Sequence, residues 1–331
     1  MANKKLAVLL LLSGGAIPLL CQEATKKTQP SGAAPILWIE PSDIRSRNLA
    51  YGSGGADDKP QPPLRFIKED MQGTSPKFTA EDRNGVKWTV KMGIEAKPET
   101  AAAHLLWAVG YFTDEDYLLK QSEISDLPEH LKRGQKFVAD GSLRDVRLKR
   151  QRNAKKIGEW RWKQNPFLSS REFNGLRVMM ALVNNWDLKD ENNAIQDGRT
   201  NHSSRYMVRD LGASFGTTGF GWSWTGGKGN LKSYRRSKFI SKLTPKYVNF
   251  GTPSRPTILY FCNVPGLIKR LRMRWIGRQI PRDDAKWMGT LLAQLSPDQI
   301  RDAFRSAGFS PEEVEGFSTV VQQRITELNN L

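Results

Sequence analysis

The stretch Asn185-Trp-Asp-Leu-Lys-Asp-Glu-Asn192 is the most informative part of this sequence. It follows a predicted helix from about Ser170 to Asn184, in which apolar residues recur at helical spacing. Within the stretch, Asp187 is followed five residues later by Asn192, so that one polar loop carries a carboxylate and an amide. Such a pair can accept a proton and offer an oxygen to a metal ion. The loop is therefore the first candidate for a chemical site.

Phosphoryl transfer is the reaction that fits this spacing. It needs a carboxylate that orients the attacking hydroxyl and accepts its proton, and an amide oxygen on the same turn that helps to hold Mg²⁺ against the phosphates. Asp187 and Asn192 fit these roles, and Lys189 is placed to reach the transferring phosphoryl group. A second carboxylate, Asp210, follows a predicted hairpin and is continued by Leu and Gly212. From that position it can bind the metal that bridges the nucleotide phosphates.

A lysine-bearing strand and a helix lie upstream. Residues 86–92 alternate between apolar and polar side chains, which predicts a half-buried strand with Lys91 near its end. Pro98 suits the first position of a helix that follows. We expect Glu99 to form an ion pair with Lys91. Glu95 is the alternative partner of Lys91. Glu99 lies in the first turn of the predicted helix, where the helix dipole by itself favours an acid, so its presence there does not require an ion pair.

In this order, the four elements resemble the protein-kinase-like superfamily. Asp-Leu-Lys-Asp-Glu-Asn and Asp-Leu-Gly are similar to the Asp-Leu-Lys-Pro-Glu-Asn and Asp-Phe-Gly motifs of protein kinases. The resemblance covers residues 86–229, under half of the chain. It implies an α+β, two-lobed kinase-like fold, with a small N-terminal β-rich lobe, a larger helical C-terminal lobe, and ATP and Mg²⁺ in the cleft. The roles it implies are phosphate binding by Lys91, pairing by Glu99, catalysis by Asp187 with Lys189, and metal binding by Asn192 and Asp210.

The sequence also departs from ordinary protein kinases. No His-Arg pair precedes Asp187, no Ala-Pro-Glu motif follows Asp210, and only Gly85 lies just ahead of Lys91, where a glycine-rich phosphate loop is expected. In these absences the chain is similar to atypical members, such as phosphoinositide kinases, bacterial toxin-type kinases and secretory-pathway kinases.

The first residues have the pattern of an export signal. Lysines precede an apolar run at 6–12, and small residues follow before Cys21. We expect residues 1–21 to be a signal peptide for a periplasmic or secreted protein, with an uncleaved membrane anchor as the alternative. Removal of this leader leaves Cys262 as the only cysteine, which excludes a disulfide within the mature chain.

Composition divides the rest of the chain. Residues 22–63 are rich in Pro, Gly, Ser, Lys and Asp, which predicts a flexible linker. We expect an N-terminal lobe over 64–135 and a C-terminal lobe over 136–331. Two helices are predicted near the end, because Ser296-Pro-Asp-Gln299 and Ser310-Pro-Glu-Glu313 have the capping-box arrangement.

Charge indicates an anionic partner. The 331 residues include 51 Lys and Arg against 34 Asp and Glu, a net charge of +17, within a composition that is 38% hydrophobic and excludes disorder. The excess concentrates at 147–156 and 228–236, so we expect an unidentified acidic substrate or surface beside the nucleotide site. Membrane association is compatible with this charge.

Other binding chemistries have less support. Trp160 and Trp162 follow the first basic run, a combination that can bind single-stranded nucleic acid, but no nucleic-acid module is recognisable and a solvated basic face is expected. His104 is expected to be structural, since no cysteine partner suggests zinc. The glycine-rich segment 213–229 is either a substrate-binding segment or a surface loop.

The sequence therefore predicts an exported, Mg²⁺-dependent ATP phosphotransferase of atypical kinase type that acts on a hydroxyl of a protein, lipid headgroup or sugar. The alternative is a non-catalytic kinase-like protein that holds an anionic polymer or a membrane surface.

Overall fold

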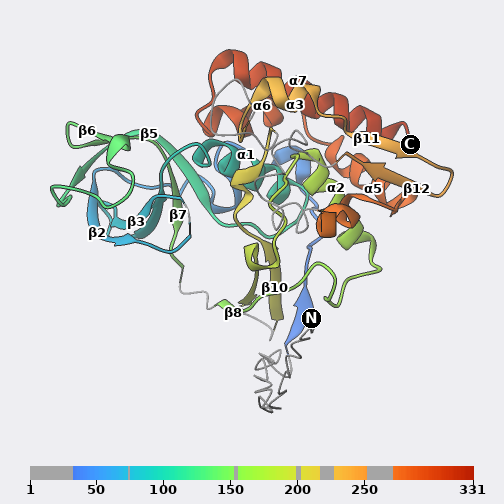
Figure 1. The fold of residues 1–331 in the computed structure, drawn as a ribbon, viewed down its shortest axis with the longest axis horizontal. Helices are drawn as coiled ribbons and strands as arrows, with labels where there is room; N and C mark the ends of the chain where they lie inside the picture. Colours follow the sequence, from blue (N-terminus) through green and yellow to red (C-terminus); the bar gives the residue numbers. More distant parts are fainter. Residues whose placement is uncertain (1–32, 74, 153–155, 199–202, 217–226, 252–270) are drawn as a thin grey trace, which may run out of the picture.

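The computed structural model describes residues 33–331 except 74, 153–155, 199–202, 217–226 and 252–270. Figure 1 shows a strand-rich lobe and a helical lobe on either side of helix α1. The helices are α1 (Ala96–Ala108), α2 (Arg171–Leu182), α3 (Leu231–Arg236), α5 (Arg282–Leu292), α6 (Pro297–Ser306) and α7 (Pro311–Asn329). The strands are β1 (Ala34–Ile36), β2 (Leu64–Asp70), β3 (Lys77–Glu81), β4 (Lys87–Lys91), β5 (Asp116–Ser125), β6 (Val138–Ala139), β7 (Ser142–Arg150), β8 (Lys156–Gly158), β9 (Asn193–Asp197), β10 (Ser203–Val208), β11 (Ile240–Leu243), β12 (Tyr247–Phe250) and β13 (Ile280–Pro281). The α+β class and the two lobes predicted from the sequence are confirmed.

The first lobe is a sheet of order β4-β3-β2-β5-β7-β6, and an additional pairing of β4 with β7 closes it on itself. Its interior is a hydrophobic core of its own, with Phe78, Trp88 and Leu148 fully buried. The alternation expected at 86–92 is present, because Trp88 and Val90 point into this core. Lys91 is also buried, at 5% exposure, on the other face of the strand.

Helix α1 lies between the two lobes. It packs on strands β5 and β7 of the first lobe and on helix α6 of the second. A helix covered on both sides needs small or apolar residues all round, which explains the run Ala101-Ala-Ala103. The helix begins at Ala96, two residues before the expected start at Pro98, and Glu95 occupies the N-cap position.

The second lobe surrounds helix α2 with α5, α7 and the sheet β1-β10-β9-β8. The hydroxyl of Ser170 caps α2 by accepting a hydrogen bond from the Phe173 amide at 3.1 Å. Both predicted capping boxes are present, at the starts of α6 and α7. These caps fix the start of each helix locally, while the apolar faces hold the helices together.

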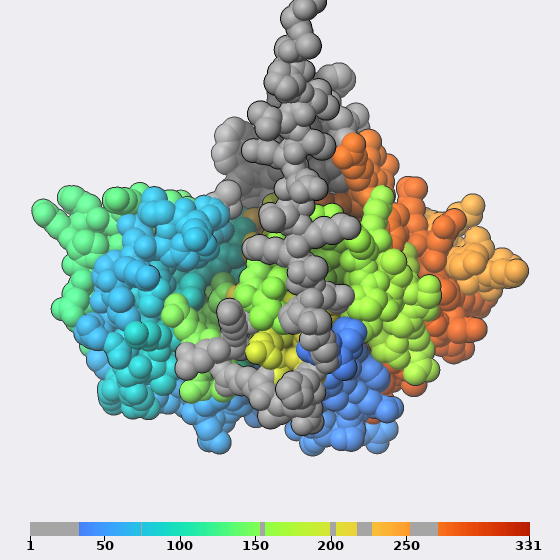
Figure 2. Space-filling view, turned by 90° about the horizontal axis from the view of Figure 1, so that it is seen from below, coloured from blue at the N-terminus to red at the C-terminus, as the bar shows by residue number. Residues whose placement is uncertain are grey.

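Residues 33–63 differ from the exposed linker predicted for 22–63. Strand β1 pairs in parallel with β10, and Leu37, Ile44 and Leu49 are buried in the core of the second lobe. Figure 2 shows the first described residues, in the darkest blue, packed against the side of that lobe. These apolar residues are few and widely spaced, so composition alone predicts a linker. The predicted signal peptide and Cys21 lie outside the described residues.

The expected boundary between the lobes at 135/136 also differs from the structure. Strand β7 belongs to the first sheet and pairs with both β4 and β5, so the first lobe continues to Arg150. Among the described residues, no helix is both long and apolar enough to cross a membrane.

Candidate active site

Lys91 lies at the centre of the site that the sequence predicts. Its Nζ is 2.8 Å from Glu99 Oε2, 2.6 Å from Glu95 Oε2 and 2.9 Å from Asp210 Oδ1. The structure thus pairs Lys91 with both rival glutamates, and it adds an aspartate that is 119 residues distant in the chain. The three carboxylates also lie within 4.8 Å of one another. We call Lys91, Glu95, Glu99 and Asp210 the Lys91 cluster.

The charges of the Lys91 cluster support one another. Burial lowers the pKa of Lys91, but the Glu99 carboxylate and the other acids more than offset this and hold the pKa well above its ordinary value. Burial raises the pKa of Glu95, yet the ammonium groups of Lys91 and Lys228 hold it well below the ordinary 4.5. Lys91 is therefore a fixed cation and Glu95 a fixed anion at neutral pH.

Asp210 follows strand β10 and adopts a left-handed backbone conformation, with φ 54° and ψ 57°. Aspartate tolerates this region better than most residues. The Asp-Leu-Gly motif continues against helix α1: a Cβ at Gly212 would lie 2.7 Å from Glu95 Cβ. Glycine at this position therefore permits the close contact that brings Asp210 and Glu95 to the same lysine.

The loop Asn185–Asn192 is held by hydrogen bonds within itself. The Asp187 amide donates to Asn185 Oδ1 at 3.0 Å, and Asn192 Nδ2 donates to the Asp187 carbonyl at 2.8 Å. Lys189 Nζ is 2.8 Å from Asp187 Oδ2, so that these two side chains form an ion pair. Asp187, Lys189 and Asn192, the three loop residues singled out from the sequence, are thus in mutual contact.

Two backbone contacts tie this loop to the segment that carries Asp210. The Trp186 amide donates to the Ala213 carbonyl at 3.4 Å, and the Arg209 amide donates to the Asn192 carbonyl at 2.8 Å. The loop and the Asp-Leu-Gly segment therefore run side by side. Through Asp210 they adjoin Lys91, so all the predicted site residues belong to one contiguous region.

A buried ion network lies behind the Lys91 cluster, and sequence reasoning missed it. Arg147 Nη2 is 3.4 Å from Glu99 Oε2, and Arg147 Nη1 donates to Asp116 Oδ1 at 2.7 Å. Asp114, two residues before Asp116, pairs with Arg209 at 3.0 Å, next to Asp210. Burial raises the pKa of Asp114, but Arg209 and the neighbouring cations hold it well below its ordinary range. The only sequence signal for this network is that acids lie two residues apart at 114 and 116, beside the start of β5, and bases lie two residues apart in β7.

The basic run at 147–156 is only partly the solvated face expected: Arg152 and Lys156 are exposed, whereas Arg147 is buried. Arg147 is 4% exposed, Lys149 pairs with Asp114, and two further arginines of the run share Asp58. Trp160 and Trp162 are each 2% exposed and pack on each other, so neither can stack on a nucleic-acid base. This run therefore contributes little to the attraction of an external anion.

The turn between β2 and β3 also reaches the site. Gly73 in this turn has φ +69°, and Ser75 Oγ donates to Glu95 Oε2 at 2.6 Å. Sequence reasoning considered Gly85 and overlooked this turn, because one glycine and one serine make no recognisable motif.

His104 is buried, as expected for a structural residue, and its Nε2 lies 2.9 Å from the Asp116 carbonyl oxygen. Cys262 lies outside the described residues.

The side chains present fit a magnesium ion. Mg²⁺ prefers carboxylate and other oxygen ligands together with substrate phosphates. The Asp210 side chain is 48% exposed, and only its Oδ1 contacts Lys91. Asn192 donates through Nδ2, so its Oδ1 is the atom that it can offer to a cation. Asp210 and Asn192 are therefore the residues that would hold the ion.

Comparisons with known proteins give a likeness to solved structures but none to known sequences. No protein-family model matches this sequence, and no curated protein matches it. Among solved structures, the proinflammatory kinase CtkA of Helicobacter pylori is similar, with a TM-score of 0.42 and 10% sequence identity. The match covers 81% of this chain and 98% of that chain. At this low similarity it carries no argument, and the interpretation of the site depends on the contacts described above.

Proposed function

We propose that this protein is a Mg²⁺-dependent phosphotransferase that uses ATP and acts on a hydroxyl group. The observation that carries the proposal is the buried ion pair of Lys91 and Glu99 beside Asp210, with the Asp187–Asn192 loop running alongside. Phosphoryl transfer needs three things: a cation held in place by a buried carboxylate, a second carboxylate, and a loop that carries a proton acceptor. Nothing in this set favours a protein, lipid or sugar as the source of the hydroxyl.

Each residue has a defined task in this reaction. Asp187 accepts the proton as the acceptor oxygen forms its bond to the γ-phosphorus, while the bond from that phosphorus to the bridging oxygen breaks and ADP leaves. Lys189, which pairs with Asp187, offers a positive charge to the transferring group. When bound by Asp210 and Asn192, Mg²⁺ supplies charge neutralisation at the phosphates.

Nucleotide binding requires one contact of Lys91 to be released. An ammonium group has three N–H donors, and the three carboxylates of the Lys91 cluster occupy them. Glu99 and Glu95 have side chains 4% and 12% exposed, whereas Asp210 is 48% exposed. Asp210 is therefore the partner that leaves, which frees Lys91 for a phosphate and Asp210 for the metal ion.

Calorimetry with ATP, in the presence and absence of Mg²⁺, tests this assignment. The wild type should bind ATP more tightly with Mg²⁺, and Asp210→Ala should abolish the metal-dependent part. Asp197→Ala is the matched control, because Asp197 is exposed at the far end of the same hairpin. Equal metal dependence in the wild type and Asp210→Ala contradicts the site.

Transfer itself is measured with γ-labelled ATP, by following the label on the protein and in free phosphate. Asp187→Asn should keep ATP binding and reduce the rate of transfer by about 10²–10⁴-fold. A wild type that binds Mg²⁺ and ATP yet transfers no phosphate to any hydroxyl, water included, contradicts a phosphotransferase.

One observation favours the alternative, a non-catalytic protein that binds an anionic polymer or surface. Helix α3 and the residues after it expose Lys232, Arg235, Arg236 and Lys238, and within the described chain none of the four has an acidic partner. This function predicts salt-sensitive binding to heparin that survives Asp187→Ala, without phosphate transfer. Heparin binding that is insensitive to salt, or unchanged in Lys232→Gln/Arg236→Gln, excludes it.

A further inference from the structure

Arg209 adjoins both residues that would hold the magnesium ion. Its backbone amide donates to the Asn192 carbonyl oxygen at 2.8 Å, and Asp210 is the next residue of the chain. Strand β10 ends at Val208, so the sheet pairing that fixes this strand does not extend to Asp210. The distance between the two proposed metal ligands therefore depends on where Arg209 is held.

The side chain of Arg209 is anchored in the other lobe. Its Nε is 3.0 Å from Oδ2 of Asp114, which lies two residues before strand β5 of the first lobe. The Asp114 side chain is 12% exposed and that of Arg209 25%, so water screens this ion pair only in part. The Asp114 carboxylate raises the pKa of Arg209, which stays charged. The ion pair thus joins the segment that carries Asp210 to the first lobe.

Asp210 needs such an anchor. Its left-handed backbone, with φ 54°, is costly for a residue other than glycine and persists only where the surroundings hold it. In the free protein its carboxylate also contacts Lys91, and the proposed mechanism releases this contact when the nucleotide binds. The segment is then held through its backbone neighbours: Arg209 before Asp210, and Gly212 packed against Glu95 after it.

We propose that Arg209 and Asp114 are positioning residues for the metal site, whose ion pair keeps Asp210 and Asn192 at the spacing that one Mg²⁺ ion requires. The inference rests on the proposed function, because it presupposes that Asp210 and Asn192 bind the ion. Mg²⁺ demands nearly ideal octahedral geometry, so misplaced ligands weaken its binding. Arg209 supplies no ligand atom itself, since a guanidinium group has only donors.

The sign of the effect separates positioning from simple electrostatics. A nearby cation repels a metal ion, so the removal of the Arg209 charge by itself strengthens Mg²⁺ binding. The loss of an anchor acts in the opposite direction. Residues that orient metal ligands typically change metal affinity by about 10–100-fold when they are replaced.

Calorimetry of ATP binding to the full chain, with and without Mg²⁺, tests this role. The measured quantity is the ratio of the two ATP affinities, which we call the Mg²⁺ gain. Arg209→Gln should reduce the Mg²⁺ gain by about tenfold or more, whereas ATP affinity without Mg²⁺ should change little, because Lys91 is intact. Arg209→Lys keeps a cation that can pair with Asp114 and should retain most of the gain.

Lys149→Gln is the matched control. Lys149 Nζ pairs with the same Asp114 oxygen at 3.5 Å, but it belongs to strand β7, which carries neither metal ligand. Lys149→Gln should therefore keep the wild-type Mg²⁺ gain. Both Lys149→Gln and Arg209→Gln leave Asp114 with one cation, so both variants should fold, and circular dichroism checks this.

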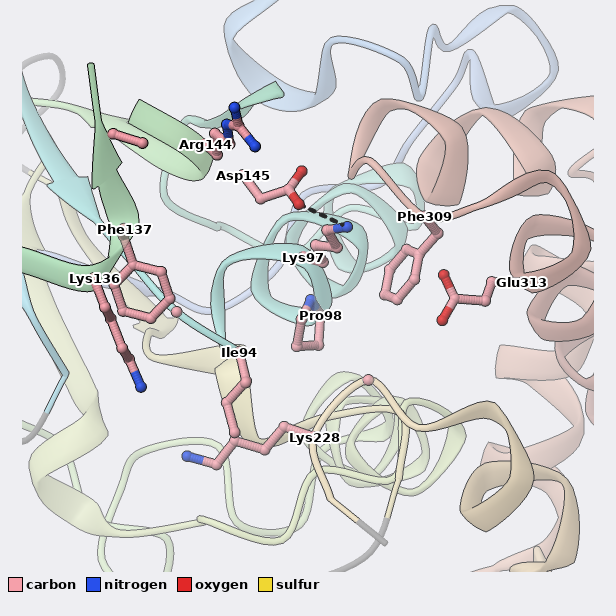
Figure 3. A pocket seen from close by; sticks show the side chains of 13 residues that line it. Ile94, Lys97, Pro98, Lys136, Phe137, Arg144, Asp145, Lys228, Phe309 and Glu313 are labelled. Carbon is pink, nitrogen blue, oxygen red and sulfur yellow. Dashed lines mark ion pairs between the residues drawn. The ribbon is translucent and has the colours of Figure 1, made fainter. Parts of the chain in front are cut away.

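A second control tests whether the loss of any ion pair at helix α1 has the same effect. Figure 3 shows Lys97 of α1 paired with Asp145 of strand β7, in a pocket at the start of the helix. This ion pair is of similar length, 3.1 Å, and includes no chain neighbour of Asn192 or Asp210. Lys97→Gln should leave the Mg²⁺ gain unchanged.

Four results overturn the proposal. An unchanged Mg²⁺ gain in Arg209→Gln removes the anchor, and a larger gain shows an effect of charge only. An equal reduction in Lys149→Gln or Lys97→Gln shows a general loosening of the first lobe. A loss in Arg209→Lys as large as in Arg209→Gln shows that the pair with Asp114 is not what positions Asp210. These four outcomes presuppose a Mg²⁺ gain in the wild type, whereas a wild type without one contradicts the proposed function itself and this inference with it.

Discussion

Replacement of Glu95 by glutamine should flatten the acid limb of the stability profile. In the folded protein, Lys91 and Lys228 hold the pKa of Glu95 well below 4.5, although burial alone raises it. A carboxyl whose pKa is lower in the folded state stabilises the fold above its unfolded pKa, and this stabilisation is lost as the pH falls. The Glu95 contribution is therefore complete at pH 6 and begins to disappear near pH 5.

The size of the effect follows from proton linkage. With an unfolded pKa of 4.5 and a folded carboxyl that stays ionised, Glu95 accounts for a loss of about 0.8 kcal/mol between pH 6 and pH 4. Urea unfolding at the two pH values measures it, because the wild type should lose about that much more free energy of unfolding than Glu95→Gln.

Ser75→Ala provides the control for this measurement. It removes the hydroxyl that donates to Glu95 at 2.6 Å but leaves both cations in place, so most of the pH dependence should remain. Equal losses in the wild type and Glu95→Gln refute the reasoning, since Glu95 would then have the same pKa in both states.

Three further substitutions test the architecture by urea unfolding. Glu99→Gln should lower the free energy of unfolding by about 3 kcal/mol, because it leaves two buried cations each short of a carboxylate; a loss below about 1 kcal/mol contradicts the buried pair. Gly212→Ala should destabilise by about 1–3 kcal/mol, since the new Cβ meets Glu95 at 2.7 Å, and an unaffected variant would refute that contact. Leu49→Ala should lower the free energy of unfolding by about 3–5 kcal/mol if residues 33–63 are core, whereas the exposed Ile39→Ala should change it by less than about 0.5 kcal/mol. If Leu49→Ala and Ile39→Ala change the free energy of unfolding equally, residues 33–63 are not part of the core and the predicted linker is the better description.

The helices and their caps could be predicted from the sequence because the interactions that form them are local. Ser170, Ser296 and Ser310 bond to amides three residues further along the chain, so the signal and its effect lie in one window. The same holds for the loop at 185–192, in which Asp187 and Asn192 contact each other within one turn. Periodicity likewise predicted the strand that ends at Lys91.

The ion-pair partners of buried charged side chains could not be predicted from the sequence. Arg147 meets Asp116 only because β7 pairs with β5, and the shared register places their acids and bases together. A run of bases has the same local pattern whether it faces water or buried acids. For this reason the assignment of the run at 147–156 to a solvated face is wrong for Arg147, while Arg152 and Lys156 are exposed as expected.

The sequence by itself determined the local elements, the order of the site residues and the net positive charge. The tertiary structure alone decided that both Glu95 and Glu99 pair with Lys91, that residues 33–63 belong to the core, and that the basic run at 147–156 is largely neutralised internally. The physical reason is distance along the chain. Backbone geometry and hydrogen bonds act over a few residues, whereas the contact between Lys91 and Asp210 joins positions 119 residues apart, and only the packing of the lobes brings them together.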